Sequence, residues 1–176
     1  MEFKELIGQR RSVRTYKADA EISDEVIRQI IAEAQMAPSW KNSQTARYYV
    51  ANTPEAVAKV REALPVFNQN SSAGASLVIT TFVKDTSGFS AGTPENELGN
   101  KWGAYDLGLA NAYFVLAAKE HGYDTLIMGI RDAQALRDAF SIPKTEQIVA
   151  VIAIGTADGQ AAFRERKPVE DICRFL

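Results

Sequence analysis

The chain has 176 residues, of which 46% are hydrophobic and 24% are charged, and its formal net charge at pH 7 is −2. This length and composition are typical of one globular domain with its own hydrophobic core, so we expect residues 1–176 to form a single domain. The mildly acidic balance argues against a dedicated nucleic-acid-binding protein, which usually carries a basic domain. Apolar stretches fall short of a membrane span and the N-terminus lacks the apolar core of a signal peptide, so we expect a cytoplasmic protein.

One cysteine and one histidine limit the chemistry of the chain. Cys173 alone cannot form an intrachain disulfide or a multi-cysteine metal site, and His121 alone cannot form a histidine metal cluster. The sequence also lacks the glycine-rich motifs of dinucleotide and nucleoside-triphosphate binding, and a single histidine leaves no plausible catalytic triad. We therefore expect no metal, and any enzymatic reaction has to be carried by an organic cofactor.

The first half of the chain reads as two helices and two strands. Ser23 can cap a helix whose first turn is acidic, and Pro38 requires that helix to have stopped or bent by Ala37. Thr53 is followed by a proline and an acid, which predicts the start of a second helix. The predicted elements are a helix from 23 to 37, a polar loop from 39 to 44, a strand from 47 to 51, a helix from 53 to 64, a polar connection from 67 to 72 and a buried strand from 77 to 83.

The second half begins with a segment from 84 to 101 in which glycine, proline and polar residues dominate. Such a segment predicts a functional or mobile loop. The helix that follows is apolar on most sides, so we expect it to be central, and Gly122 ends it. The remaining predicted elements are a helix from 102 to 121, a short strand from 125 to 130, a small helix capped by Asp132 and a buried strand from 148 to 154. The order of these elements leaves the directions of the strands open.

Basic residues gather near both ends of the chain, against this mildly acidic background. Guanidinium groups present a fixed fork of donors that suits phosphate, and a serine hydroxyl adds a donor that can turn to fit. On spacing alone, a solvated basic helix end is the commoner meaning of such a cluster. The two clusters could close on one phosphate only through the fold. Their residues are Arg10, Arg11, Ser12 and Arg14 near the N-terminus, and Arg164 and Arg166 near the C-terminus.

Four motifs in register resemble the successive signatures of the nitroreductase family. The order and approximate spacing of the motifs match along nearly the entire chain. The resemblance implies an α+β homodimer with a mixed, mostly antiparallel central sheet flanked by helices, and with a C-terminal arm that reaches the other subunit. The apolar end of the tail, Phe175-Leu176, fits such an arm. The motifs are Arg10 to Arg14 followed by Tyr16, Ala37-Pro38-Ser39 followed by Asn42-Ser43-Gln44, Thr125 to Gly129, and Arg164-x-Arg166-x-Pro168.

The resemblance names FMN as the bound cofactor and assigns residues to it. Arg14 matches a basic position near the pyrimidine edge of the flavin, where a cation favours the anionic reduced form. Other matched positions hold the phosphate and the ribityl chain or lie within the same motifs. They are Arg10, Arg11, Ser12, Arg164 and Arg166.

Further matched positions surround the flavin ring. Met128 and Gly129 match a segment whose backbone N–H groups approach N5 and O4, so these residues and Arg14 are the expected catalytic contacts. Asn68 matches an asparagine that contacts the ring, and Ser71 stands where some relatives carry a lysine. The loop expected to reach the flavin of the opposite subunit contributes Pro38, Ser39 and Asn42, together with Trp40, which either lines a cavity over the flavin or is buried.

These assignments predict an FMN-dependent oxidoreductase with NAD(P)H as co-substrate. In the expected ping-pong reaction, NAD(P)H gives a hydride to flavin N5, and the reduced flavin passes electrons to a nitroaromatic, quinone or similar small-molecule acceptor. Two alternatives stay open: a flavin-binding or regulatory protein with little turnover, and a flavin-fragmenting or dehalogenating relative. Nucleic-acid binding through the basic clusters would require a strong, salt-dependent affinity, which the acidic balance disfavours.

Overall fold

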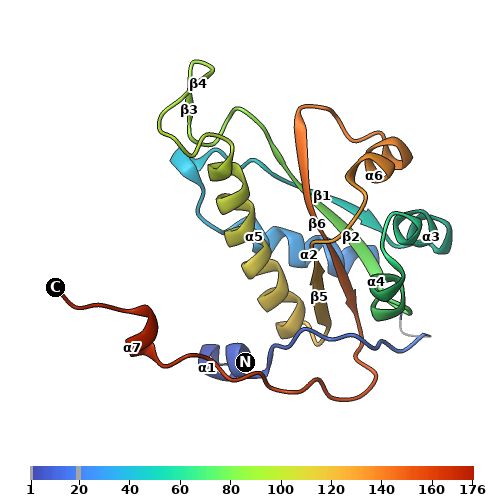
Figure 1. Ribbon diagram of the computed structural model, residues 1–176. Coiled ribbons are helices and arrows are strands. Elements are labelled where there is room, and N and C mark those ends of the chain that lie inside the picture. Colours follow the sequence, from blue (N-terminus) through green and yellow to red (C-terminus); the bar gives the residue numbers. More distant parts are fainter. Residues whose placement is uncertain (1, 19–20) are drawn as a thin grey trace.

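A central sheet lies between two layers of helices in the computed structural model, which describes residues 2–18 and 21–176 (Figure 1). The sheet has four antiparallel strands in the order β1-β2-β6-β5. In the described residues, its parallel component is a bridge between Ser12 and Thr125. The expected α+β class and mostly antiparallel sheet are therefore confirmed. The strands are β1 Ala46–Ala51, β2 Ser76–Val83, β5 Asp124–Met128 and β6 Glu146–Gly155.

The two central strands, β2 and β6, are apolar along most of their length because helices cover both faces of the sheet. Successive side chains of a strand point to opposite faces, so each strand feeds two cores. Leu77 and Ile79 enter the core on one side, and Val78 enters the core on the other. All three side chains are fully buried, as the continuous apolar run from 77 to 83 predicts.

Helices α2, Asp24–Ala34, and α5, Lys101–Glu120, cover the first face of the sheet. The hydroxyl of Ser23 accepts the N–H of Val26 at 3.3 Å, which confirms the predicted cap. Ile27 and Ile30 of α2 pack with Phe114 of α5 in a core that also holds Val78. Helix α5 is thus central, as its apolar sequence predicts.

Helices α3, Pro54–Glu62, and α6, Ala133–Phe140, cover the second face. Side chains cap both: the Thr53 hydroxyl accepts the N–H of Ala56, and a carboxylate oxygen of Asp132 accepts two N–H groups of the first turn of α6. Val60 and Leu136, one from each helix, are fully buried in the core between these helices and the sheet.

Three segments expected to be irregular contain short elements. These are the 3-10 helix η1, Trp40–Asn42; the helix α4, Val66–Ser71; and the hairpin of β3, Phe89–Ser90, with β4, Thr93–Pro94. The expectation of a connection without a helix from 67 to 72 is wrong, because the polar side chains there find partners within the fold. Asn68 donates its amide to the carbonyl of Ile130 at 3.0 Å, and the Ser72 hydroxyl donates to the carbonyl of Asn68 at 2.8 Å.

The two ends of the chain lie outside the three layers. The short helices α1, Phe3–Gln9, and α7, Val169–Ile172, flank the segments that carry the basic clusters. Figure 1 shows the chain after β6 passing beneath the sheet and beyond α1, so that the C-terminus lies away from the body of the molecule. Phe175 is 96% exposed. The described part of one chain therefore leaves the apolar end of the tail uncovered.

Candidate functional site

The N-terminal arginine segment lies against the ends of β5 and β6. The N–H of Val13 donates to the carbonyl of Thr125 at 3.0 Å. Further along, Thr15 and Asp158 exchange two bonds: the N–H of Asp158 donates to the carbonyl of Thr15, and the Thr15 hydroxyl donates to the carbonyl of Asp158. These bonds hold the N-terminal segment beside the chain that follows β6, and so bring the two basic clusters together.

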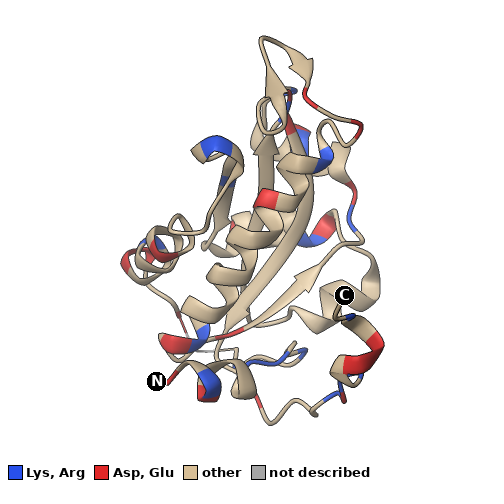
Figure 2. Ribbon diagram, turned by 90° about the vertical axis from the view of Figure 1, so that its left-hand side faces the viewer, with Lys and Arg blue, Asp and Glu red and all other residues tan. Residues whose placement is uncertain are grey.

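Both clusters line one cavity of about 510 Å³. The guanidinium of Arg11 lies 4.9 Å from the centroid of the Phe163 ring, a cation–π contact that joins the N-terminal and C-terminal segments. Figure 2 marks the basic residues on both segments in blue. The structure thus places all five residues predicted to hold the phosphate, and Arg14, on one cavity. Its lining is Arg10, Arg11, Ser12, Val13, Arg14, Thr15, Gln160, Ala161, Ala162, Phe163, Arg164 and Arg166.

The cavity concentrates positive charge. Burial lowers the pKa of Arg10, and the neighbouring Arg166 and Arg11 lower it further. Arginine side chains are effectively always charged in proteins, so the cavity stays positive despite this repulsion. In the described part of the chain, no ion pair joins the arginines of this cavity to an acid. A bound anion would relieve this mutual repulsion.

Most of the donors in the cavity remain available. One N–H of Arg14 donates to the carbonyl of Ser12 at 3.2 Å, and one N–H of Arg166 donates to the carbonyl of Arg164 at 2.8 Å. Each guanidinium carries five donors, so these bonds orient the side chains without exhausting them. The arrangement can therefore bind a phosphate through several charge-assisted hydrogen bonds.

The residues predicted to approach the flavin ring lie at the end of β5 and on α4. The side chain of Met128 is buried, whereas Gly129 is exposed, so the segment can offer its backbone to a ligand while Met128 anchors it. The bond from Asn68 to the carbonyl of Ile130 places α4 beside this segment. Ser71 is half-buried on the same helix. None of these residues lines the arginine cavity.

The loop from 38 to 44 lies at the other end of α5. It is attached near the beginning of that helix, where Asp106 accepts the N–H of Trp40 at 2.9 Å. The arginine segment instead pairs with Thr125, which follows the C-terminal end of α5. The 14 residue steps from Asp106 to Glu120 correspond to roughly 21 Å of helix. Figure 1 shows the same separation, so one subunit does not bring Pro38, Ser39 and Asn42 to its own arginine cavity.

The conformation of this loop is unusual for its sequence. Lys41, Asn42 and Gln44 have positive φ angles of 47°, 56° and 48°, a region that residues other than glycine seldom adopt. The Ser39 hydroxyl accepts the N–H of Gln44 at 3.0 Å and closes the loop on itself. Backbone strain of this kind clusters at functional sites.

Trp40 packs into the protein rather than into an open cavity. Its ring lies 4.7 Å from that of Trp102, with an interplanar angle of 51°. The indole N–H of Trp102 donates to the Asn96 side chain at 2.8 Å. Of the two roles open to Trp40, these contacts favour burial against α5, from which it supports the loop.

Sequence reasoning missed Asp106. This carboxylate is 5% exposed and accepts both the Trp40 N–H and the hydroxyl of Ser87. The available signal was one acid inside a long apolar helix. Without the fold, nothing in the sequence pointed to the loops that it binds.

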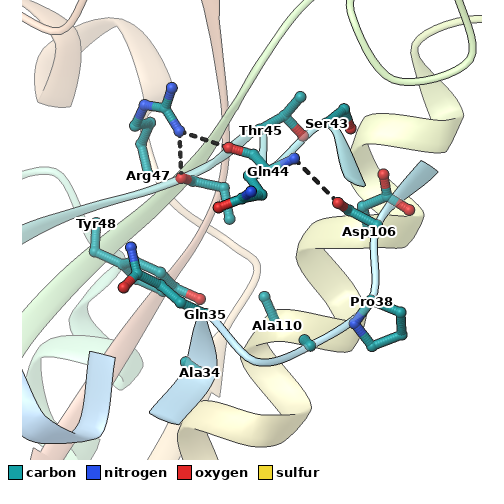
Figure 3. A pocket seen from close by; sticks show the side chains of 13 residues that line it. Ala34, Gln35, Pro38, Ser43, Gln44, Thr45, Arg47, Tyr48, Asp106 and Ala110 are labelled. Carbon is teal, nitrogen blue, oxygen red and sulfur yellow. Dashed lines mark hydrogen bonds between the residues drawn. The ribbon is translucent and has the colours of Figure 1, made fainter. Parts of the chain in front are cut away.

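A second cavity, of about 390 Å³, lies between the end of α2, the start of β1 and the middle of α5, as Figure 3 shows. Its lining includes Pro38, Ser39, Tyr48 and Asp106. Burial raises the pKa of Tyr48 to about 12, so its hydroxyl stays protonated at neutral pH. Among the described residues, the hydroxyls of Ser43, Thr45 and Tyr48 are enclosed without a hydrogen-bond partner.

The described residues lack two kinds of feature. No helix there is both long enough and apolar enough to cross a membrane. No three metal-binding side chains (histidine, cysteine, aspartate or glutamate) gather there into a group that could hold a metal ion.

Comparison with known proteins gives one family. The model of the nitroreductase family matches residues 7–156. A Bacillus subtilis protein, provisionally named NAD(P)H nitroreductase YdgI, is 28% identical over 99% of this chain and 97% of its own length. A shorter match, 37% identical over 40% of this chain and 32% of the relative, is to an enone reductase of conjugated linoleic acid biosynthesis from Lactiplantibacillus plantarum.

Solved structures share the fold. A provisionally assigned nitroreductase from Exiguobacterium sibiricum, solved in complex with FMN, superposes with a TM-score of 0.89 at 23% identity and covers 100% of this chain and 98% of its own. A nitroreductase family protein from Streptococcus pneumoniae gives a TM-score of 0.85 at 21% identity, covering 99% of this chain and 100% of its own. These likenesses extend over the sheet and both helical layers.

Proposed function

The chain belongs to the nitroreductase family, and from that premise we propose that it is a single-domain, FMN-dependent NAD(P)H oxidoreductase. The observation that carries the proposal is the cavity where five arginines meet with no acidic side chain in the lining. An organic phosphate balances that charge. The FMN in the Exiguobacterium sibiricum complex and the NAD(P)H in the name of the Bacillus subtilis relative indicate which phosphate ester and which hydride donor to test.

We assign the phosphate of FMN to the part of the cavity around the half-buried Arg10 and its neighbour Arg166. Arg10 is partly desolvated and repelled by its basic neighbours, so it gains most from a dianion. Arg11, Ser12 and Arg164 line the same cavity and add donors for the phosphate and the ribityl chain. This arrangement would bind the cofactor by its phosphate and leave the ring to be placed by other segments.

We assign the ring to the end of β5. The exposed backbone at Gly129 can donate N–H bonds to it, and Asn68 on α4 stands beside that segment. Arg14 is an exposed residue of the arginine cavity and would supply a cation for the pyrimidine edge. When bound, FMN supplies the hydride chemistry itself. The protein has only to bind, orient and electrostatically stabilise the ring, and that accords with a chain that has one histidine.

A homodimer completes the site in this proposal. Pro38, Ser39 and Asn42 lie at the opposite end of α5 from the arginine cavity, so they can reach a flavin only in another subunit. A two-fold axis would exchange the two loops reciprocally. One side of α5 leaves small and aromatic residues exposed at the spacing of a helical stripe, which suits a subunit interface. These residues are Ala104, Tyr105, Gly108, Ala112 and Tyr113.

The absorption spectrum of the purified protein tests the proposal. We expect a yellow protein with about one FMN per subunit that NADH or NADPH bleaches under nitrogen, and that a quinone or nitroaromatic acceptor reoxidises. Bound FMN that neither nucleotide bleaches would instead identify a binding protein with little turnover, and flavin consumed in air would identify a flavin-fragmenting relative. A colourless protein that FMN cannot reconstitute would contradict the assignment.

A further inference from the structure

Asp106 is a buried acid in an apolar helix, and the helix itself gains nothing from it. Removing a carboxylate from water costs free energy unless hydrogen bonds compensate. The carboxylate accepts two hydrogen bonds from loops: one from the Trp40 N–H at 2.9 Å, and one from the Ser87 hydroxyl. Ser87 is itself buried, so this contact is shielded from water. The carboxylate therefore acts on the two loops, not on α5.

The loop that Asp106 binds has a strained backbone. Three of its residues hold positive φ angles, and such strain persists only where surrounding contacts impose it. The Ser39–Gln44 bond closes the loop but does not attach it to the body of the protein. The bond from the Trp40 main chain to Asp106 makes that attachment. Figure 3 shows the Asp106 side chain on α5 close to the loop, with Pro38 and Gln44 on the same cavity.

A second set of contacts couples this loop to the segment after the β3–β4 hairpin and to the first turn of α5. Lys41 pairs with Glu95 at 2.6 Å, and the ring of Trp40 packs on that of Trp102. The Lys41 side chain is 67% exposed, so its ion pair contributes little by itself. Among the residues that make these contacts, Asp106 is buried. One of its carboxylate oxygens accepts hydrogen bonds both from the loop, at Trp40, and from the segment before the hairpin, at Ser87.

We propose that Asp106 is a positioning residue for the flavin ring. It holds the loop from Pro38 to Asn42 in the conformation that contacts the ring bound by the other subunit. This inference rests on the proposed function. It assigns Asp106 a role in binding the flavin ring, whereas the arginine cavity binds the phosphate. The two roles can be separated with riboflavin, which has the ring of FMN but no phosphate.

The test measures the Kd of FMN and of riboflavin for variants of the full-length protein, by quenching of flavin fluorescence. Asp106→Leu removes the acceptor at similar volume and should weaken both ligands by the same factor, about tenfold. Asp106→Asn keeps an acceptor oxygen without the charge and should weaken both about threefold, which is partial rescue. Arg166→Ala, in contrast, should weaken FMN much more than riboflavin.

Ser87→Ala is the matched control for stability. It removes the second donor to the same oxygen and leaves the bond to Trp40 in place. We expect a lower Tm, with both Kd values within about twofold of wild type. The visible circular dichroism of bound FMN should change in the two Asp106 variants and stay constant in Ser87→Ala, because only the former move the loop at the ring.

Three outcomes would contradict either the positioning role of Asp106 or the proposed function. If the wild type binds FMN and Asp106→Asn binds both flavins as the wild type does, the positioning role is overturned and the proposed function stands, whether or not Asp106→Leu folds. A loss of affinity confined to FMN would also overturn it, because the effect would then lie at the phosphate. A wild type that binds no FMN contradicts the proposed function instead.

Discussion

Tyr48 and Tyr49 are adjacent on β1, face opposite sides of the sheet and meet opposite environments. The ring of Tyr48 stacks on Phe114, with centroids 5.7 Å apart, and its enclosed hydroxyl has no partner among the described residues. The hydroxyl of Tyr49 donates to the carboxylate of Glu146 at 2.9 Å. Burial and this bond both raise the pKa of Tyr49, to about 12.

Removing the two hydroxyls should therefore change stability in opposite directions. Tyr48→Phe deletes an unpaired buried group, so we expect the free energy of unfolding to rise by about 1 kcal/mol. Tyr49→Phe deletes a donor to a charged group that is only 7% exposed, so we expect it to fall by about 1–3 kcal/mol. Urea unfolding of both variants at pH 7 measures the difference. Equal destabilisation would show that Tyr48 has a partner, such as ordered water, that its surroundings do not reveal.

Arg14 should influence the electronics of a bound flavin more than its affinity. It lies on the arginine cavity but is exposed, and the half-buried Arg10 is better placed to bind phosphate. A cation near the pyrimidine edge stabilises the anionic reduced flavin. Arg14→Ala should therefore lower the two-electron midpoint potential, by about 30 mV for each 1.4 kcal/mol of lost stabilisation. Redox titration of the FMN-loaded variant measures this shift, and an unchanged potential would reject the role.

The role of a site residue was predictable where residues of the same chemical type lie close together in the sequence. Arginines near each end of the chain indicate an anion site, and the fold places them on one cavity. Asp106 was not predictable, because its function depends on loops whose positions only tertiary structure sets. Asn68 lies between these cases. The family resemblance suggests it, while its partly buried bond to the Ile130 carbonyl appears only in the fold.

Helices were predictable from the sequence where an apolar periodicity begins at a capping residue. The caps at Ser23, Thr53 and Asp132 were all predicted, and all three accept N–H bonds from the first turn of their helices. Helix α4 was missed because its polar side chains bond to other segments, which no local pattern encodes. Strand direction was also unreadable from the order of elements, since the pairing of β6 with both β2 and β5 is non-local.

The cap of α6 offers a test at the scale of a single element. One carboxylate oxygen of Asp132 accepts the N–H groups of Gln134 and Ala135 at 2.9 and 3.0 Å. Asp132→Ala should lower the free energy of unfolding by about 1 kcal/mol, whereas Asp132→Ser should recover most of it, because serine also caps. Thermal unfolding of the two variants measures this. Asp132 lies three residues after Gly129, where we propose that the flavin ring binds, so an accompanying change in FMN affinity would show that the cap also stabilises the proposed flavin site.

At the scale of the whole molecule, the flavin site that we propose would need a second subunit to complete it. The arginine cavity lies beyond one end of α5 and the strained loop lies near the other end, so under this proposal a single subunit contributes to two different flavin sites. The apolar stripe on α5 and the exposed end of the tail are the surfaces that a second copy would cover. These four features have one common explanation in a two-fold dimer.

Deleting residues 169–176 should therefore weaken dimerisation and FMN binding together. The tail carries Val169, Ile172 and Phe175, each more than half exposed in one chain. If each tail covers its neighbour, its loss should raise the dimer dissociation constant, and dilution should then release FMN. Light scattering with parallel measurement of bound flavin tests both effects. Replacing exposed Glu170 and Asp171 by alanine is the matched control, because it leaves the apolar contacts intact and should change neither property. A monomer of 19.3 kDa that still holds FMN tightly would show that one chain completes the site.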